Sequence, residues 1–191
     1  MMSFLSSLLV ILMASRAAGW VGGAAAAPMS ARRCGTHERR GASIHCGPRV
    51  RIVSVGKPSR DESWITSAID GYVKRLRSTL ELDLAWVKDD NALVSAVERC
   101  EEVSIILDER GPTATSVDLA DRLFAALEEG GSRMSFFIGG AEGLPPNLKK
   151  DRSRLLSLSS LTLTHQMARL LLVEQVYRAT EIRKGSGYHK D

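Results

Sequence analysis

The chain has 191 residues, of which 44% are hydrophobic and 25% are charged. This is the composition of an ordinary soluble globular protein, and the length leaves little room for a second large domain. The net charge of +4 is unevenly placed, because residues 1–50 carry six arginines against one glutamate and net +5, which leaves −1 for the rest. The basic character of the whole chain therefore does not by itself indicate nucleic-acid binding.

Residues 1–49 are predicted to be a targeting leader. The apolar run 4–13 has the length of a signal-peptide hydrophobic region, and the segment 29–48 is rich in arginine and small residues. A signal-like segment in front of a transit-like segment resembles the two-part leader of plastids acquired by secondary endosymbiosis. A secreted protein is the simpler interpretation of the apolar run, and a mitochondrial presequence is the simpler interpretation of the arginines.

The cysteines argue against secretion. Cys34 and Cys46 lie in the removable part, so only Cys100 remains and no disulfide framework follows. We therefore expect a plastid (chloroplast) protein, with the mitochondrion as the alternative, and no membrane association in the mature form.

From residue 50 onward the pattern alternates between strands and helices. Strands are predicted at 50–55, 82–87, 103–107, 135–138 and 155–158, and helices at about 60–80, 90–99, 116–129 and 165–183. The expected helix caps are Ser59 or Asp61, Asp89 or Asp90, Thr115 or Ser116, and Thr164. This alternation predicts an α/β domain over residues 50–191 with a mostly parallel sheet covered by helices on both faces.

Two neighbouring stretches carry the strongest functional signal. The strand at 135–138 ends in Gly139 and Gly140, with Gly143 three residues later. The apolar segment 158–163 comes after a basic connector, residues 149–154. Glycines at the carboxyl end of a parallel strand let a ligand touch the main chain, and small molecules bind at that edge of open α/β sheets. A tight turn followed by a core strand is the structural alternative.

Taken together, Ile-Gly-Gly-x-x-Gly at 138–143 and Leu-Ser-x-Leu-Thr-Leu at 158–163 resemble the cofactor-binding signature of the RlmH family. Members of that family are SPOUT methyltransferases that methylate a pseudouridine of large-subunit ribosomal RNA. The resemblance spans residues 50–191 and implies a trefoil-knotted, SPOUT-type α/β fold. It also implies that the end of the third strand at Leu107, the turn from Gly139 and the segment 158–163 converge on S-adenosylmethionine.

The expected cofactor-binding residues follow from that convergence. Leucines could sandwich the adenine ring, main-chain groups could read its polar edge, and Gly143 could take a positive φ. Substitution of Gly139 is expected to weaken cofactor binding more than folding. The full predicted set is Leu107, Gly139, Gly140, Gly143, Leu158, Ser159, Ser160, Leu161, Thr162 and Leu163.

Other cofactor classes lack their motifs. No Gly-x-Gly-x-x-Gly follows the first strand and no Gly-x-x-x-x-Gly-Lys-Ser/Thr occurs, so dinucleotide and P-loop nucleotide sites lose their main support. No metal site is predicted.

A basic region lies late in the chain, where residues 149–191 hold nine basic and four acidic side chains. Such asymmetry suits a protein that turns one face to phosphates, although a solvated helix face is the alternative for the basic residues of the last helix. The predicted RNA-binding residues are Lys149, Lys150, Arg152, Arg154, Arg169 and Lys190.

The tail Tyr188-His189-Lys190 resembles the family's C-terminal Tyr-His-Arg, which is thought to complete the active site in the dimer. That resemblance suggests Tyr188 for stacking on the target base and His189 as the base or an RNA-orienting group, because imidazole is a common proton carrier in proteins. A functionless terminus is the alternative. His165 is expected to be a structural residue at the start of the last helix.

The resemblance implies an S-adenosylmethionine-dependent methyltransferase acting on N3 of a pseudouridine in large-subunit rRNA, as a homodimer on the assembled ribosome. A non-catalytic ribosome-associated factor with the same fold and a SPOUT methyltransferase acting on tRNA are the alternatives.

Overall fold

A computed structural model describes residues 47–58 and 60–190 of the chain. The predicted leader, apart from its last three residues, lies outside the described residues. The elements are β1 (Arg49–Val55), the 3-10 turn η1 (Arg60–Glu62), α1 (Ser63–Leu76), β2 (Glu81–Val87), α2 (Asp90–Glu98), β3 (Val103–Leu107), α3 (Ser116–Glu129), β4 (Arg133–Ile138), the 3-10 turn η2 (Arg152–Arg154), β5 (Leu155–Leu156) and α4 (His165–Arg183). The predicted boundary after residue 49 falls one residue inside β1.

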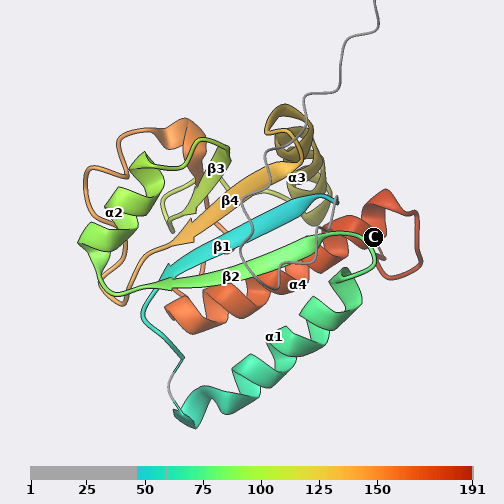
Figure 1. Cartoon of the computed structure of the whole chain (residues 1–191), viewed down its shortest axis with the longest axis horizontal. Helices are drawn as coiled ribbons and strands as arrows, with labels where there is room; N and C mark the ends of the chain where they lie inside the picture. Colours follow the sequence, from blue (N-terminus) through green and yellow to red (C-terminus); the bar gives the residue numbers. More distant parts are fainter. Residues whose placement is uncertain (1–46, 59, 191) are drawn as a thin grey trace, which may run out of the picture. The chain divides into compact units, whose positions relative to one another are not determined.

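The five strands form one parallel sheet in the order β2-β1-β4-β3-β5 (Figure 1). Helices α1, α3 and α4 pack against one face of this sheet, and α2 packs against the other. The α/β class and the parallel sheet with helices on both faces are therefore confirmed. None of the helices in the described part of the chain combines the length and hydropathy that crossing a bilayer requires.

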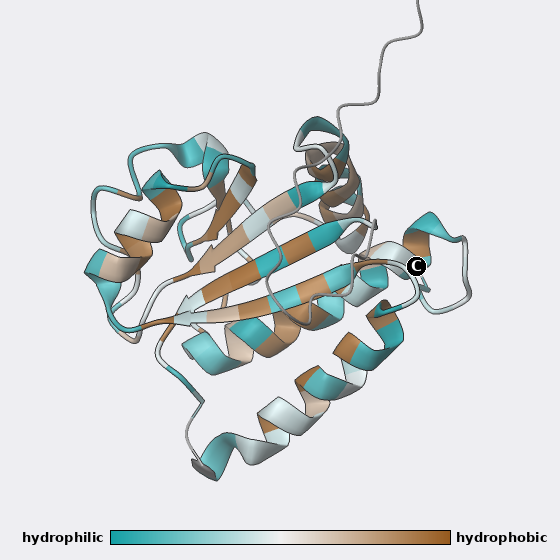
Figure 2. Ribbon diagram, in the orientation of Figure 1, coloured by the Kyte–Doolittle hydropathy of each residue, from teal (hydrophilic) through white to brown (hydrophobic). Residues whose placement is uncertain are grey.

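Strand side chains alternate between two apolar cores. Ile105 and Leu107 of β3 contact the larger core under α1, α3 and α4, whereas Ile106 contacts the smaller core under α2. The same alternation places Phe136 and Phe137 of β4 on opposite faces. Figure 2 shows hydrophobic residues in brown along the strands. Apolar cores cover both faces of these strands, which explains why β3 and β4 are almost continuous apolar runs.

Three of the predicted helix caps are confirmed. Asp89 accepts a hydrogen bond from the Ala92 amide at 2.9 Å, and Thr164 accepts one from the Met167 amide at 3.3 Å. Thr115 forms a reciprocal capping box with Asp118 at the start of α3.

Two predicted elements are shorter in the structure. Helix α1 ends at Leu76 and not near residue 80, because the amides of Thr79 and Leu80 both bond to the Leu76 carbonyl and close the helix. Its N-cap is Glu62, which makes no side-chain cap bond, and not Ser59 or Asp61. Strand β5 ends at Leu156 and not at residue 158.

The loop after β3 explains why β5 ends early. The Asp108 amide donates to the Leu156 carbonyl at 3.0 Å, and the Ser157 amide donates to the Pro112 carbonyl at 3.0 Å. A Cβ atom on Gly111 would lie 2.8 Å from the Leu156 backbone, so the loop lies directly against the strand. This close contact suits a chain that passes through the loop, but the knot itself stays a prediction.

Candidate functional site

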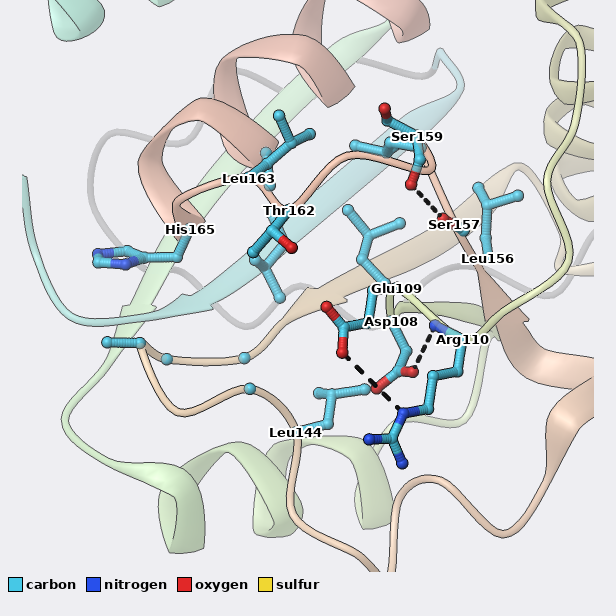
Figure 3. A pocket seen from close by; sticks show the side chains of 18 of the residues that line it. Asp108, Glu109, Arg110, Leu144, Leu156, Ser157, Ser159, Thr162, Leu163 and His165 are labelled. Atoms are coloured by element: carbon cyan, nitrogen blue, oxygen red, sulfur yellow. Dashed lines mark hydrogen bonds and ion pairs between the residues drawn. The ribbon is translucent and has the colours of Figure 1, made fainter.

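A cavity of about 380 Å³ lies at the carboxyl ends of β3 and β4. Its walls come from three segments far apart in sequence: residues 107–110 after β3, the glycine turn 138–144 after β4, and residues 156–165 before α4. Figure 3 shows Thr162 and Leu163 across the cavity from Asp108 and Glu109. The volume is within the usual range of small-molecule pockets, about 300–1,000 Å³.

The cavity combines apolar side chains with nearby polar groups. Leu107, Ile138 and Leu156 are buried parts of the core that also line the cavity, whereas Leu161 is 72% exposed at its mouth. Segment 157–161 is held by its own polar bonds, since the Ser157 hydroxyl donates to the Ser159 carbonyl at 2.8 Å. A flat apolar ring with polar edges would fit such a wall.

The glycine turn is shaped by contacts within the turn itself. Gly143 has φ of +83°, as predicted, and its amide bonds to the Gly140 carbonyl at 3.1 Å. A Cβ atom on Gly139 would lie 2.7 Å from the Gly143 carbonyl oxygen. Any side chain at this position would therefore displace the turn as well as approach the cavity, and the expected greater loss of cofactor binding than of folding stays a prediction.

An ion pair with a buried carboxylate forms part of the wall. The Asp108 side chain is 3% exposed, and its Oδ2 lies 3.2 Å from Lys149 Nζ. Its Oδ1 accepts a hydrogen bond from the Arg110 amide at 2.9 Å. Lys149, predicted to contact RNA, thus lines the cavity and connects the loop after β3 to the basic connector.

The cavity collects most of the residues that the sequence motif singled out. Those in its lining are Leu107, Gly139, Gly140, Gly143, Leu158, Ser159, Leu161, Thr162 and Leu163, and Ser160 is exposed outside it. The motif did not indicate the further lining residues Asp108, Glu109, Arg110, Ile138, Ala141, Glu142, Leu144, Leu156, Ser157, His165 and Ala168. The position of Asp108, directly after a buried parallel strand, was the one signal that could have identified it.

The predicted RNA-binding residues divide into exposed side chains and side chains that are partly or fully buried. Lys150, Arg152 and Lys190 are exposed, and Arg152 donates to the Arg110 carbonyl at 3.3 Å. Arg154 is half-buried and donates to the Ser104 hydroxyl at the start of β3. The exposed members remain available for phosphate contacts.

Arg169 is 1% exposed, so its predicted contact with RNA is wrong for this structure. Its guanidinium donates to Gln166 Oε1 at 2.7 Å, to the Ser54 hydroxyl and to the Gly56 carbonyl at 3.3 Å. It also lies 5.2 Å from the centre of the Trp86 ring. Burial lowers the pKa of this arginine, and the charge of Glu62 opposes that shift. Arg169 therefore connects α4 to the end of β1.

The tail residues Tyr188 and His189 contact Glu174 and Arg178 of α4 and not the residues that line the cavity. Helix α4 begins at the cavity with His165 and runs for 19 residues, a length of about 28 Å at the usual helical rise. Figure 1 shows the end of α4 near the amino ends of the strands. Among the described residues, neither Tyr188 nor His189 lines the cavity of its own chain.

The tail packs against α4. The Tyr188 hydroxyl donates to Glu174 Oε1 at 3.2 Å, and its ring meets that of Tyr177 edge-on at 5.0 Å. The pKa of Tyr188 is raised to about 12. Burial is the largest cause, and a hydrogen bond with Tyr72 and the nearby Glu174 charge raise this pKa further.

Comparison with known proteins identifies close relatives. The family model described as "Predicted SPOUT methyltransferase" matches residues 49–189. A protein of Protochlamydia amoebophila is 47% identical over 142 residues, which covers 74% of this chain and 99% of that protein. A protein of Thermus thermophilus is 39% identical over 142 residues, covering 74% of this chain and 98% of that protein. Both are named "Ribosomal RNA large subunit methyltransferase H".

Among solved structures, a probable methyltransferase from Bordetella pertussis is 14% identical and has a TM-score of 0.46, covering 69% of this chain and 96% of that chain.

Proposed function

Because the chain belongs to the SPOUT methyltransferase family, we propose that it transfers a methyl group from S-adenosylmethionine to large-subunit ribosomal RNA. In finer detail, the proposed target is N3 of a pseudouridine in the assembled ribosome. The observation that carries the proposal is the single cavity made by three backbone segments that the family signature names. Relatives named for this activity, matched over nearly their whole length, support the same substrate class.

The residues of the cavity fit S-adenosylmethionine, the cofactor of this family. Leu107, Leu158 and Leu163 would pack against the adenine, and the main chain of the glycine turn would bond its polar edge. Glu109 and Glu142 add acidic side chains to the lining, which suits the positive charges of the amino group and the sulfonium. The bound cofactor supplies a methyl group that the sulfonium has already activated.

The chain's own residues must then position the RNA and handle one proton. A pyrimidine nitrogen attacks well only when it is held in line with the methyl group and has lost its proton, so orientation supplies much of the rate. We propose that Tyr188 stacks on the target base, that His189 orients it and that Lys190 holds a phosphate. Lys150 and Arg152, both exposed, would add phosphate contacts along the connector.

We propose that the protein works as a homodimer in which the tail of one chain completes the cavity of the other. The separation of tail and cavity along α4 supports this arrangement. Helix α4 also leaves Met167 and Leu171 only partly buried within the chain, and a second copy could cover this apolar surface. A two-fold dimer would place both tails in equivalent positions.

The dimer can be tested by mixing two inactive variants. Leu107→Trp fills the cavity but keeps the tail, and a chain ending at residue 185 keeps the cavity but lacks the tail. Mixed dimers should regain activity if the tail acts on the partner's cavity. Recovery should be absent if the tail acts within its own chain.

The proposed activity can be tested with purified substrates. The protein should methylate intact ribosomes and not tRNA, and calorimetry should detect S-adenosylmethionine binding. Methylation of tRNA alone would replace the proposal with the transfer-RNA alternative. Absence of cofactor binding would favour a non-catalytic ribosome-associated factor.

We also propose that residues 1–49 direct the protein into a plastid. The arginine-rich segment behind an apolar run supports this proposal. A fluorescent protein fused to residues 1–49 should enter the plastid, and accumulation in mitochondria would select the alternative. Mass spectrometry of large-subunit rRNA from that organelle should show loss of one pseudouridine methylation when the gene is disrupted.

A further inference from the structure

A hydrogen-bond network along the second half of α4 holds the tail, and Glu174, at the middle of the helix, is the centre of this network. Glu174 Oε1 accepts bonds from Arg178 Nη2 at 2.7 Å, from Arg178 Nε at 3.1 Å and from the Tyr188 hydroxyl at 3.2 Å. Its Oε2 accepts a bond from Gln175 Nε2 at 2.7 Å. Both oxygens of one carboxylate are thus occupied by side chains of α4 and the tail.

Arg178 contacts both tail residues of the proposed active site. Its Nη1 lies 3.4 Å from His189 Nδ1, and its Cζ lies 5.0 Å from the centre of the Tyr188 ring. One guanidinium therefore bonds the glutamate on two nitrogens and reaches the imidazole with the third.

The contact with Arg178 has a consequence for the imidazole. Arginine has only donors, so His189 Nδ1 must be the acceptor in this bond. The neutral imidazole then carries its hydrogen on Nε2. In this arrangement His189 presents a donor at Nε2 and is suited to orient a base edge or a phosphate.

This network differs from an ordinary ion pair on a helix surface. The Glu174 and Arg178 side chains are 15% and 25% exposed, and the pair has three further bonding partners outside the i, i+4 contact. A solvent-exposed glutamate and lysine at this spacing add little to the stability of the fold and do not hold a third side chain in place. Packing of Tyr188 on Tyr177, which itself contacts Tyr72 at 5.6 Å, fixes the tail from the other side.

We propose that Glu174 and Arg178 are positioning residues for methyl transfer, which hold Tyr188 and His189 in one arrangement for delivery to the partner's cavity. This inference rests on the proposed function, because it requires that the tail takes part in the reaction. The physical reason is preorganisation: a tail that is already ordered loses little conformational entropy when the RNA binds. Neither residue needs to touch the cofactor or the RNA.

The first test replaces Glu174 by glutamine, which keeps the size of the side chain and removes its charge. Methyl transfer to ribosomes should lose about 10–100-fold in kcat, the range expected when a reacting group is misplaced by about 1 Å. The Kd for S-adenosylmethionine should not change, because Glu174 is not among the residues that line the cavity. Arg178→Lys should lose activity similarly, since one ammonium cannot bond the carboxylate on two nitrogens and also reach His189.

The second test separates positioning from stability. The double variant Glu174→Arg with Arg178→Glu restores the ion pair, so its melting temperature should return toward that of the wild type, but kcat should stay low because the partners of Tyr188 and His189 are exchanged. Glu128→Gln is the matched control. It breaks an exposed ion pair between Glu128 of α3 and Arg183 of α4, and it should leave kcat unchanged. Recovery of kcat in the double variant would overturn the inference.

A third readout does not depend on activity. Nitrogen chemical shifts of His189 should report a hydrogen on Nε2 in the wild type and a mixture of tautomers in Glu174→Gln. A wild type with the hydrogen on Nδ1 would overturn the inference. If the wild type transfers methyl groups and Glu174→Gln keeps its full kcat, the inference alone fails, whereas a wild type that transfers none overturns the proposed function and the inference together.

Discussion

Replacing Arg169 by methionine distinguishes a structural arginine from an RNA contact. The substitution keeps a long side chain but removes the donors that serve Ser54 and Gln166, each 1% exposed. A buried polar group that loses its partner costs about 1–3 kcal/mol, so two such groups cost about 2–6 kcal/mol. This is a large share of the free energy of unfolding of a domain, about 5–15 kcal/mol.

Urea unfolding followed by circular dichroism measures this loss. The free energy of unfolding of a small protein falls by about 2 kcal/mol for each molar increase in urea, so a loss of about 4 kcal/mol in this free energy lowers the urea midpoint by about 2 M. Arg49→Met is the control, because Arg49 is exposed and pairs with Glu81 at 2.8 Å; its loss should stay below about 1 kcal/mol. An unchanged midpoint for Arg169→Met, together with weaker and less salt-dependent ribosome binding, would refute the structural assignment.

Three further predictions concern the turn, a helix cap and the tail. Gly139→Ala should reduce S-adenosylmethionine affinity in calorimetry and also lower the urea midpoint, because its Cβ would meet the Gly143 carbonyl at 2.7 Å; loss of affinity at an unchanged midpoint would contradict the proposed displacement of the turn. Thr115→Ala removes a capping box and should cost about 1 kcal/mol in urea unfolding, and a change in cofactor affinity would argue against a purely local effect. Tyr188 should form tyrosinate only at about pH 12, as its raised pKa implies, so ultraviolet absorbance should show one late-titrating tyrosine that Tyr188→Phe lacks. Below about pH 10, which is the ordinary pKa of tyrosine, Tyr188 is neutral both when the tail packs on α4 and when the tail is released. Between about pH 10 and pH 12 only the released tail ionises, so packing of the tail on α4 should weaken as the pH rises through this range.

The predicted strands and helices were mostly confirmed because short-range patterns determine them. Apolar periodicity identified the parallel sheet, and the caps Asp89, Thr115 and Thr164 start their helices by bonding an amide two or three residues away. The error at β5 occurred where a distant segment decides the outcome. Strand β5 ends at Leu156 because the loop after β3 takes its next hydrogen bond.

The candidate site shows the same division. The glycine and leucine motif pointed to a pocket because its spacing reflects backbone geometry at a strand end, and the cavity lies there. The pair of Asp108 and Lys149 was missed because its members are 41 positions apart and meet only through the fold. Charge alone also could not show which basic residues face solvent.

The sequence by itself determined the α/β class, the family and the backbone segments that form the cavity, since each of these depends on residues close together in the chain. Only the tertiary structure decided that Arg169 is buried beside Trp86 and that Tyr188 and His189 are held by Glu174 and Arg178 in the second half of α4. Burial and hydrogen-bond partners depend on groups contributed by distant segments, and those groups come together only when the chain has folded.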